Sequence, residues 1–484
     1  MSIVFIIGTF IVLLGAGIYG TTMDKFAIWK FVLFSVPLLT YIIVMFSSRD
    51  RLRFILLSLI IFLPFIGLKI PPGSLGLTVF DVLMFFTFFL LLAEKLGAKR
   101  EIVLIPTHHD WFPLFLLIPS ALTSISYFNS LGSLISIGEI YLAYVLLVNF
   151  VSEKEFIERL HLNLAFALII VCLFVLLEKA TGINFNYGAA HSGQYMQVDK
   201  YVVHRTAGIF QDPQKAAQFI GVIMTYLIVV NCRKTFQNSF YMLVSNVAIA
   251  LSIPALFITV SRAAIFGSMA VSAVFFLFFN KAGLVGKLFM GCALCLVLVF
   301  GWLAGGKDVV LSKVLPASTL RRLEKSSDDI QGRTRVWEDS WRVFKSSPLT
   351  GIGPGNYREF FFQENPNLRE FFAHGGFVPD MPESGYLKIL YEVGIIGSIG
   401  CIYFFFRFMG TAAGNFIIQA DKHLVSLCIA SIAAMLVFLA TFITIFTVSD
   451  KRNAMIVPLL AAIVFAGSGR PKTPMGAVNG VRSL

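Results

Sequence analysis

The sequence predicts an all-α fold, a polytopic transmembrane helical bundle of about 12–14 spans with a large, partly helical loop outside the membrane. Two observations support this prediction. Of the 484 residues, 57% are hydrophobic and 14% are charged, whereas a soluble domain carries roughly 25% charged residues. Apolar runs of roughly 15 to 25 residues also recur along the chain, and about 20 such residues let a helix cross the hydrocarbon core. A soluble globular protein is therefore excluded.

The apolar runs define the candidate spans one by one. Two of them are weak, because the run 54–68 contains Pro64 and the run 453–468 is short, so twelve or thirteen spans are alternatives to fourteen. In chain order the candidate spans are 2–20, 28–46, 54–68, 79–96, 111–127, 131–151, 161–181, 214–231, 241–260, 263–280, 288–305, 384–409, 423–447 and 453–468.

Basic residues in the short connections indicate the orientation, because cytoplasmic loops are enriched in Lys and Arg. The formal charge of +12 is spread over these connections, so no nucleic-acid partner is expected. With the N-terminus inside, the inner segments contain most of the basic residues, which predicts that both termini are cytoplasmic. The inner set is Arg49, Arg51, Arg53, Lys95, Lys99, Arg100, Lys154, Arg159, Arg233, Lys234, Lys281, Lys287, Arg407, Lys422, Arg470, Lys472 and Arg482; the outer set is Lys25, Lys30, Lys69, Arg262, Lys451 and Arg452.

Two longer segments fall on the outer side and divide the chain into three parts. Residues 1–305 are predicted to form a transmembrane bundle with an outside loop at 182–213. Residues 306–383 form an outer cap, and residues 384–484 form the C-terminal transmembrane helices and a cytoplasmic tail. The charged residues of the cap are balanced in sign and dense enough for an ordered soluble segment.

An amphipathic helix is expected within the cap. Trp337, Trp341 and Phe344 are spaced i, i+4 and i+7, which gathers three aromatic side chains on one helix face. Such a face packs on the bundle or lies in the lipid interface. The helix is predicted to end near Pro348, because the glycine-rich run 351–355 that follows forbids regular helix.

Two arginines on the outer side are candidate anion-binding residues. Arg262 stands between two apolar runs with almost no loop around it; a charge at this depth faces a cavity or partner, or extends to lipid headgroups. Arg205 precedes Asp212-Pro213, a pair typical of an N-cap and the first residue of a helix. The free N–H groups of that helix and the Arg205 guanidinium would together favour a phosphate group.

The segment 374–397 supplies candidate acid–base groups at the outer edge of a span. Glu383 either caps the helix that follows or acts as general base for a hydroxyl group. His374 lies among glycines, so a solvent-exposed histidine is the alternative to a catalytic one. The sequence has no HExxH, Walker, GxSxG or paired-acid metal motif, which leaves hydrolase, ATPase and nucleotide-sugar transferase functions without support.

Four short motifs follow one another in the second half of the chain. They are Arg205-Thr206-Ala207-Gly208-Ile209-Phe210 with Asp212-Pro213; Ser261-Arg262; Gly332-Arg333 to Trp337, running into Pro348-Leu349-Thr350-Gly351-Ile352-Gly353; and Tyr386-Leu387 with Glu392-Val393-Gly394-Ile395-Ile396-Gly397. In order and spacing, these motifs resemble the O-antigen ligase and polysaccharide polymerase superfamily of bacterial inner-membrane glycosyltransferases.

This resemblance implies a GT-C-like fold and transfer of a glycan from an undecaprenyl-diphosphate donor to an acceptor hydroxyl on the periplasmic face. It implies no metal or nucleotide cofactor, since arginines would stabilise the charge that develops on the leaving diphosphate. The implied partners are the lipid-linked donor and acceptor and membrane lipids, with a chain-length regulator as a further candidate. The candidate catalytic residues are Glu383, Arg262 and His374; the candidates for diphosphate or substrate binding are Arg205, Arg333, Arg335 and Tyr386.

One departure from the ligase pattern favours a polymerase of O-antigen, capsule or exopolysaccharide repeat units. Ligases that modify lipid A core have a His-Asn pair directly before the Tyr-Leu helix start, where this chain has Glu383-Ser384-Gly385. Glu383 is therefore expected to take the position of the base, with His374 as the alternative. Within the superfamily, a ligase or a protein O-oligosaccharyltransferase is the alternative function.

A flippase of lipid-linked glycans is the alternative from another class. It predicts charged span interiors and two matching halves with broken helices. The charges inside the predicted spans are few, chiefly Asp81, Glu139 and Glu392, and the single large late loop is asymmetric. Asp81 and Glu139 are interpreted as buried polar contacts that support the fold.

Overall fold

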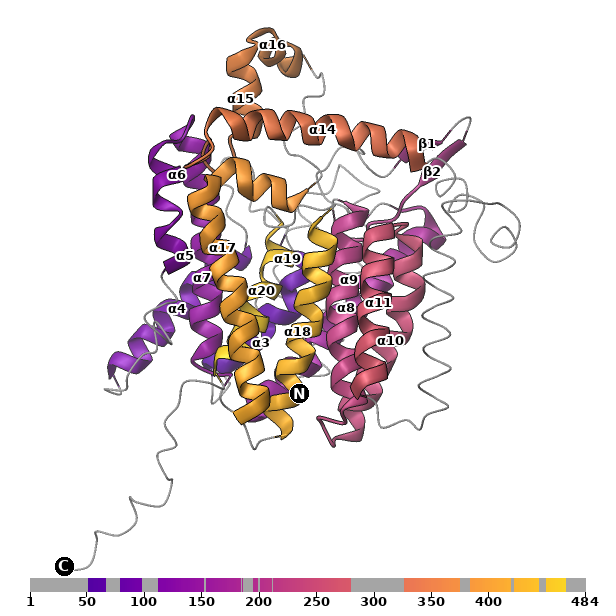
Figure 1. The fold of residues 1–484 in the computed structure, drawn as a ribbon. Helices are drawn as coiled ribbons and strands as arrows, with labels where there is room; N and C mark the ends of the chain where they lie inside the picture. The colour runs from indigo at the N-terminus through magenta and orange to yellow at the C-terminus, as the bar shows by residue number, and fades with distance from the viewer. Residues whose placement is uncertain are drawn as a thin grey trace, which may run out of the picture.

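A computed structural model shows a helical bundle with a long helix lying across one end (Figure 1). Six helices of the described residues are long and apolar enough to cross a membrane: α7 (Tyr127–Val148), α8 (Lys154–Thr181), α9 (Pro213–Cys232), α10 (Ser239–Ile258), α17 (Gly385–Ile418) and α18 (Lys422–Phe442). The predicted polytopic helical bundle is therefore confirmed. The structure describes residues 51–66, 79–97, 112–151, 154–183, 185, 195–198, 201–210, 212–279, 326–374, 384–418, 422–443 and 450–466.

The other described helices are shorter or less apolar. They are α3 (Arg51–Phe62) with the 3-10 turn η1 (Leu63–Phe65), α4 (Val79–Gly97), α5 (Phe112–Phe115), α6 (Ile118–Leu122), α11 (Arg262–Phe279), α14 (Ser326–Ser346), α15 (Tyr357–Glu364), α16 (Asn367–Ala373), α19 (Lys451–Ala454) and α20 (Ile456–Ala466). One antiparallel hairpin, β1 (Tyr195–Val198) and β2 (Tyr201–His204), pairs Tyr195 with His204. The predicted outer loop 182–213 thus contains the strands described in this fold.

Two regions differ from the predicted spans. The run 111–127 is not a single span but the two short helices α5 and α6, because Pro119 in the first turn of α6 lacks the N–H that a continuous helix requires. Helix α17 continues to Ile418, so Arg407 lies within a helix and not in an inner connection. The candidate spans 2–20, 28–46 and 288–305 lie outside the described residues.

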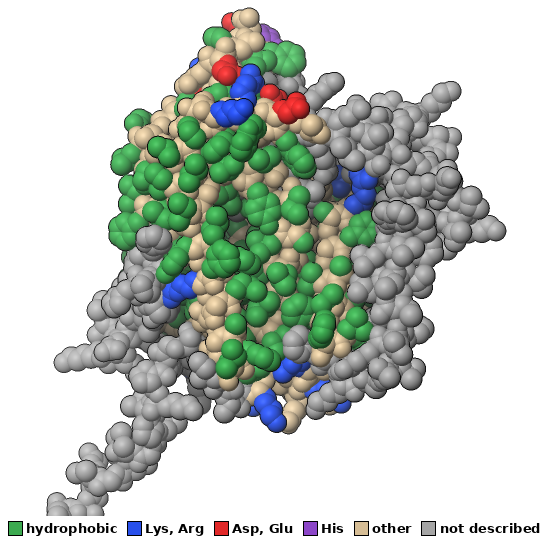
Figure 2. All heavy atoms as spheres, viewed as in Figure 1, with side chains coloured by type: hydrophobic (Ala, Val, Ile, Leu, Met, Phe, Trp, Pro, Cys, Tyr) green, Lys and Arg blue, Asp and Glu red, His purple; other side chains and the backbone are tan. Residues whose placement is uncertain are grey.

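The main core runs along the long helices. Helix α8 packs on α10, and α9 packs on both α11 and α18. Small side chains such as Ala216, Ala217 and Ala264 are fully buried between them, which lets the helices approach closely. Hydrophobic side chains cover the flank of the bundle in Figure 2, and most of the visible Lys and Arg side chains lie toward its ends. This distribution is expected for a lipid-facing surface.

Helix α14 is the predicted amphipathic helix, and it ends at Ser346, close to the predicted boundary. Among the α14 side chains that the structure describes, Ser340 and Val343 are buried, whereas Trp337 and Trp341 are 36% and 46% exposed. Of the three aromatic residues in the predicted face, Phe344 is the one that packs on the small core around Val343. The aromatic face is therefore mostly turned away from the bundle.

The glycine-rich motif after α14 docks on a break in α17. At Gly394 the backbone leaves helical geometry, with φ 65° and ψ −168°, so nearby backbone groups can bind other partners. The Ile352 N–H donates to the carbonyl of Tyr391 (2.9 Å), and the Ile395 N–H donates to the carbonyl of Pro348 (2.9 Å). Two motifs that lie apart in the sequence therefore form one joint between the cap and the bundle.

Glu392 belongs to this joint. Its carboxylate accepts the Gly355 N–H (2.8 Å) and lies 3.4 Å from the Lys388 ammonium. Its backbone carbonyl accepts a hydrogen bond from the hydroxyl of Ser120 in α6 (2.6 Å). This interior charge is thus paired and hydrogen-bonded, as a buried carboxylate requires, and it connects the cap, α17 and the α6 helix.

Candidate functional site

The segment between β2 and α9 carries Arg205 and is held firmly at one end of the bundle. The carboxylate of Glu178, near the end of α8, accepts the N–H groups of Ala207 (2.9 Å) and Gly208 (2.5 Å). Gly208 has φ +59°, and a Cβ there would lie 3.1 Å from Val175, so this turn requires glycine. Arg205 is only 6% exposed. Its guanidinium is therefore fixed at depth and not free in solvent.

Helix α9 begins where the sequence predicts. The carboxylate of Asp212 accepts the Gln214 N–H (2.7 Å), and Pro213 occupies the first helical turn. The interpretation of Asp212-Pro213 as a helix start is confirmed. Because Asp212 caps this helix, Lys215 lies in the first turn of α9, at the same end of the bundle as Arg205. Sequence reasoning did not select Lys215, because a single lysine after a helix cap carries no distinctive pattern.

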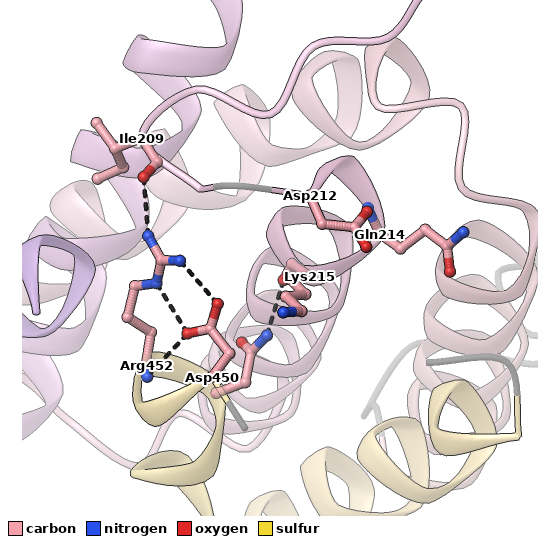
Figure 3. A network of polar contacts seen from close by, with 7 residues as sticks. Ile209, Asp212, Gln214, Lys215, Asp450 and Arg452 are labelled. Atoms are coloured by element: carbon pink, nitrogen blue, oxygen red, sulfur yellow. Dashed lines mark hydrogen bonds and ion pairs between the residues drawn. The ribbon is translucent and has the colours of Figure 1, made fainter. Parts of the chain in front are cut away.

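A clamp on this segment comes from Arg452 of α19 (Figure 3). Its guanidinium donates to both carboxylate oxygens of Asp450 (2.8 and 2.7 Å) and to the carbonyl of Ile209 (2.8 Å). The same guanidinium lies 4.1 Å from the centre of the Phe210 ring. Arg452 and Asp450 are both about 5% exposed. One buried ion pair thus secures the carboxyl-terminal half of the Arg205 segment.

The residues beside Arg452 extend this connection in two directions. The side-chain amide of Asn453 donates to the carbonyl of Lys215 (2.9 Å), which ties α19 to the first turn of α9. The Lys451 ammonium points into the bundle, 3.1 Å from Asp81 of α4 and 2.5 Å from Glu139 of α7. Both carboxylates are buried. Asp81 and Glu139 are therefore the buried fold-supporting contacts that the sequence predicts.

Arg262, the first residue of α11, lies at the corner that the Arg205 segment contacts. The hydroxyl of Thr206 donates to the carbonyl of Ile258, the last residue of α10, over 3.4 Å. Val260, in the turn between α10 and α11, has φ 54°, a conformation that is uncommon for a β-branched residue. This sharp turn lets α11 begin directly after α10 and sets Arg262 at its first position.

The packing of α9 against α11 brings Lys215 to the level of Arg262. The hydroxyls of Thr225 and Ser272 lie 2.8 Å apart, and these residues are separated by 47 positions in the sequence. Gly221 packs against Ser268 with the same separation. Because the two helices run in parallel with the same rise per residue, this register continues to Lys215 and Arg262. The two cations therefore occupy neighbouring helix starts.

Positive groups gather at the starts of α9 and α11, where the Asp212 carboxylate also caps α9. The first N–H groups of a helix have no intrahelical acceptor, and the helix dipole adds positive potential there. Two such helix starts carry Lys215 and Arg262, and Arg205 enters from the adjoining segment. We name this group, Arg205, Lys215 and Arg262, the cationic corner. Guanidinium and ammonium groups are the side chains that phosphate and diphosphate ligands commonly meet in proteins.

The other predicted site residues lie elsewhere or are not described. Tyr386, in the first turn of α17, donates its hydroxyl to the carbonyl of Leu439 (2.9 Å) and thereby joins α17 to α18. His374 is exposed at the end of α16, which projects away from the bundle (Figure 1), and its Nδ1 lies 2.8 Å from the carbonyl of Glu370. The structure does not bring His374 to the cationic corner.

The side chains of three predicted site residues lie outside the described part of the structure. Arg333 and Arg335 lie on α14, the helix that crosses one end of the bundle. Glu383 lies outside the described residues; it directly precedes Ser384, whose carbonyl accepts the Lys388 N–H at the start of α17 (3.1 Å). Their roles therefore stay predictions.

The fold defines a multi-pass membrane protein, and the cationic corner lies at one end of its bundle. The sequence model of a family described as O-antigen ligase matches residues 247–402. This match confirms the resemblance to the O-antigen ligase and polysaccharide polymerase superfamily, and it indicates a glycosyltransferase-type enzyme. The matched region contains Arg262, α14 and the joint at Gly394. A search of curated proteins gave no significant match.

Replacing Asp450 by asparagine is expected to destabilise the fold by about 3–5 kcal/mol at pH 7, because the buried Arg452 guanidinium loses its counter-charge. Burial alone would raise the pKa of Asp450, but the charge and hydrogen bonds of Arg452, with the charge of Lys215, outweigh it and lower the pKa. A lowered pKa in the folded state means that the stabilisation is complete above the unfolded pKa and is lost as pH falls through the folded value.

The thermal unfolding midpoint in detergent, measured at pH 7 and below pH 4, tests this expectation. The difference between the wild type and Asp450→Asn should shrink in acid. The control is Asp339→Asn, which removes an exposed partner of Arg342 (50% and 55% side-chain exposure) and should change stability little. Equal effects of the two substitutions at pH 7 would contradict the role of the buried pair.

Proposed function

We propose that this protein transfers a glycan from a polyprenyl-diphosphate donor to an acceptor sugar hydroxyl at the outer end of the bundle, and that it polymerises lipid-linked repeat units. The observation that supports this most directly is the cationic corner on a membrane-embedded bundle. A lipid-held diphosphate needs cationic groups at membrane depth. The buried Arg205 and the partly buried Arg262 supply them.

The proposed reaction is a displacement at the anomeric carbon of the donor glycan. The acceptor hydroxyl oxygen forms the new bond to that carbon as the bond to the diphosphate oxygen breaks, which inverts the anomeric configuration. The leaving diphosphate takes the bonding electron pair, and Arg205, Lys215 and Arg262 stabilise the charge that develops on it. Glu383, directly before α17, is the proposed base that accepts the hydroxyl proton.

A polymerase rather than a ligase is proposed because Glu383-Ser384-Gly385 stands where the resembled ligases have a His-Asn pair. The cap joint supports a shared site, because it fixes α14, with Arg333 and Arg335, across the same end of the bundle. Arg333 and Arg335 are therefore proposed to contact the glycan or the diphosphate. The proposed site faces the periplasm of a bacterial inner membrane.

Disruption of the gene should leave lipid-linked glycans as single repeats, which gel electrophoresis and mass spectrometry of the lipid-linked pool detect. Accumulation of full-length lipid-linked polymer would instead identify a ligase. The purified protein in detergent, given a lipid-linked repeat, should form longer lipid-linked chains. A flippase would form none there, because it moves its substrate across a membrane without making a bond.

A further inference from the structure

A pocket on the flank of the bundle lies away from the cationic corner. It has a volume of about 140 Å³ between α5, α7, α17 and α20, and its walls include Ile140, Tyr144, Phe404 and Ala461. An apolar cavity of about 150 Å³ is large enough to take up a benzene-sized group. The pocket therefore has room for a short stretch of hydrocarbon chain.

Arg407 is the charged residue among the side chains that line this pocket. It lies eleven residues before the end of α17 at Ile418, which corresponds to about 16 Å along the helix axis. Its guanidinium lies 5.1 Å from the centre of the Phe465 ring, also in the pocket wall. A cation within an apolar helix is costly unless it meets an anion, water or a polar partner.

Exposed apolar side chains surround Arg407 on α17. The neighbouring side chains Ile402 and Phe406 are 54% and 67% exposed, as expected where α17 borders the membrane. On α7 the pocket wall includes Tyr144, four residues before the helix ends at Val148, about 6 Å along the axis. The pocket thus lies close to the end of α7, and the long Arg407 side chain can extend from it toward phospholipid phosphates.

We propose that this pocket binds one acyl chain of an anionic membrane phospholipid, whose phosphate pairs with Arg407. The proposal is independent of the proposed transferase function. Charge and shape together select this occupant: an apolar cavity takes the chain, and a guanidinium beside it takes the phosphate.

The polyprenyl-diphosphate donor is another lipid that carries phosphate and could occupy this pocket. The cationic corner, however, lies toward the end of the bundle where α17 starts, whereas the pocket lies farther along α17. Helix α17 starts near the cap joint, at the end of the bundle where α14 lies. From there it runs away from α14 toward Arg407. A donor whose diphosphate reaches the corner would place its phosphate far from Arg407. Competition between the two lipids therefore distinguishes them.

The test uses the full-length protein in nanodiscs of equimolar phosphatidylglycerol and phosphatidylcholine, released into detergent and weighed by native mass spectrometry. The wild type should retain phosphatidylglycerol over phosphatidylcholine. Arg407→Gln should reduce that retention roughly tenfold, as loss of a charge-assisted contact predicts. Arg407→Lys should keep the preference in part, and Ala461→Leu, which fills the pocket, should reduce retention of both lipids. The control Arg159→Gln removes an exposed arginine of α8 and should change nothing.

Equal retention of the two lipids by the wild type would overturn the proposal, and so would unchanged retention in Arg407→Gln. Displacement of phosphatidylglycerol by polyprenyl phosphate would assign the pocket to the donor lipid instead. A lipid-free dimer would assign it to a second copy of the chain. The wild-type comparison decides the proposal even if a pocket variant fails to fold, which thermal unfolding of each variant detects.

Discussion

Replacing Arg262 by alanine is expected to slow glycan transfer by about 10²–10³-fold, the usual effect of removing one preorganised donor from a developing charge. Arg262 begins α11 at the level of Lys215 and beside the Arg205 segment, and the proposed function has its guanidinium contact the donor diphosphate. Arg262→Lys should recover part of the rate, because it restores the charge without the planar donor pair. The measurement is chain elongation by purified protein on a lipid-linked repeat.

Arg205→Ala should have a similar effect, and Lys215→Met a smaller one, because a single ammonium donates fewer directed hydrogen bonds than a guanidinium. The control is Arg159→Ala, which removes an exposed arginine that pairs with Glu155 within α8. This control should transfer glycan at the wild-type rate. Normal chain length in cells that express Arg262→Ala, Arg205→Ala and Glu383→Gln separately, at normal protein levels, would show that the site is assigned wrongly.

Replacing Gly394 by alanine is expected to prevent the cap from docking and to sharply lower the yield of folded protein. The combination of φ 65° and ψ −168° is open almost only to glycine, and forcing another residue into it costs about 1–3 kcal/mol. A Cβ at this position would also lie 2.3 Å from the carbonyl oxygen of Leu349, a backbone atom that cannot move aside easily. The two motifs of the cap joint would be forced apart.

Gly410 in the same helix provides a matched control. A Cβ there meets nothing within 4 Å, so Gly410→Ala should stabilise α17 by about 0.5–1 kcal/mol through its higher helix propensity. Gly351→Ala, on the other side of the joint, should behave like Gly394→Ala, since its Cβ would lie 2.3 Å from the Glu392 carbonyl oxygen. Monodisperse protein in size-exclusion chromatography and the thermal midpoint measure these effects. A stable Gly394→Ala variant would refute the joint.

Local features of the site were predictable from the sequence. Asp212-Pro213 specifies a helix start through chemistry within four residues, and the structure has that cap. The apolar runs around 214–231 and 241–260 likewise predict α9 and α10 within two residues. The prediction of one span over 111–127 was wrong, because apolar composition alone does not show that a proline divides the stretch into two helices.

The partners that hold the site were not predictable. Arg452 clamps Ile209 across 243 sequence positions, and Glu178 binds the turn at Gly208 across 30. Neither residue stands out in the sequence, because a charge beside a span is also expected at the membrane surface. The register between α9 and α11 sets Lys215 level with Arg262, and this register depends on small residues such as Gly221, which faces Ser268.

The sequence by itself determined that this protein is a bundle of membrane helices, where most of them begin and end, and which superfamily it resembles. Hydrophobicity, helix caps and short motifs act over a few residues, and therefore they can be read along the chain. The tertiary structure decided which cations share a corner, how the cap attaches to α17 and where Arg407 lies. These features depend on packing between distant segments, since the free energy of burying a charge or fitting a glycine is set by neighbours that the local sequence does not name.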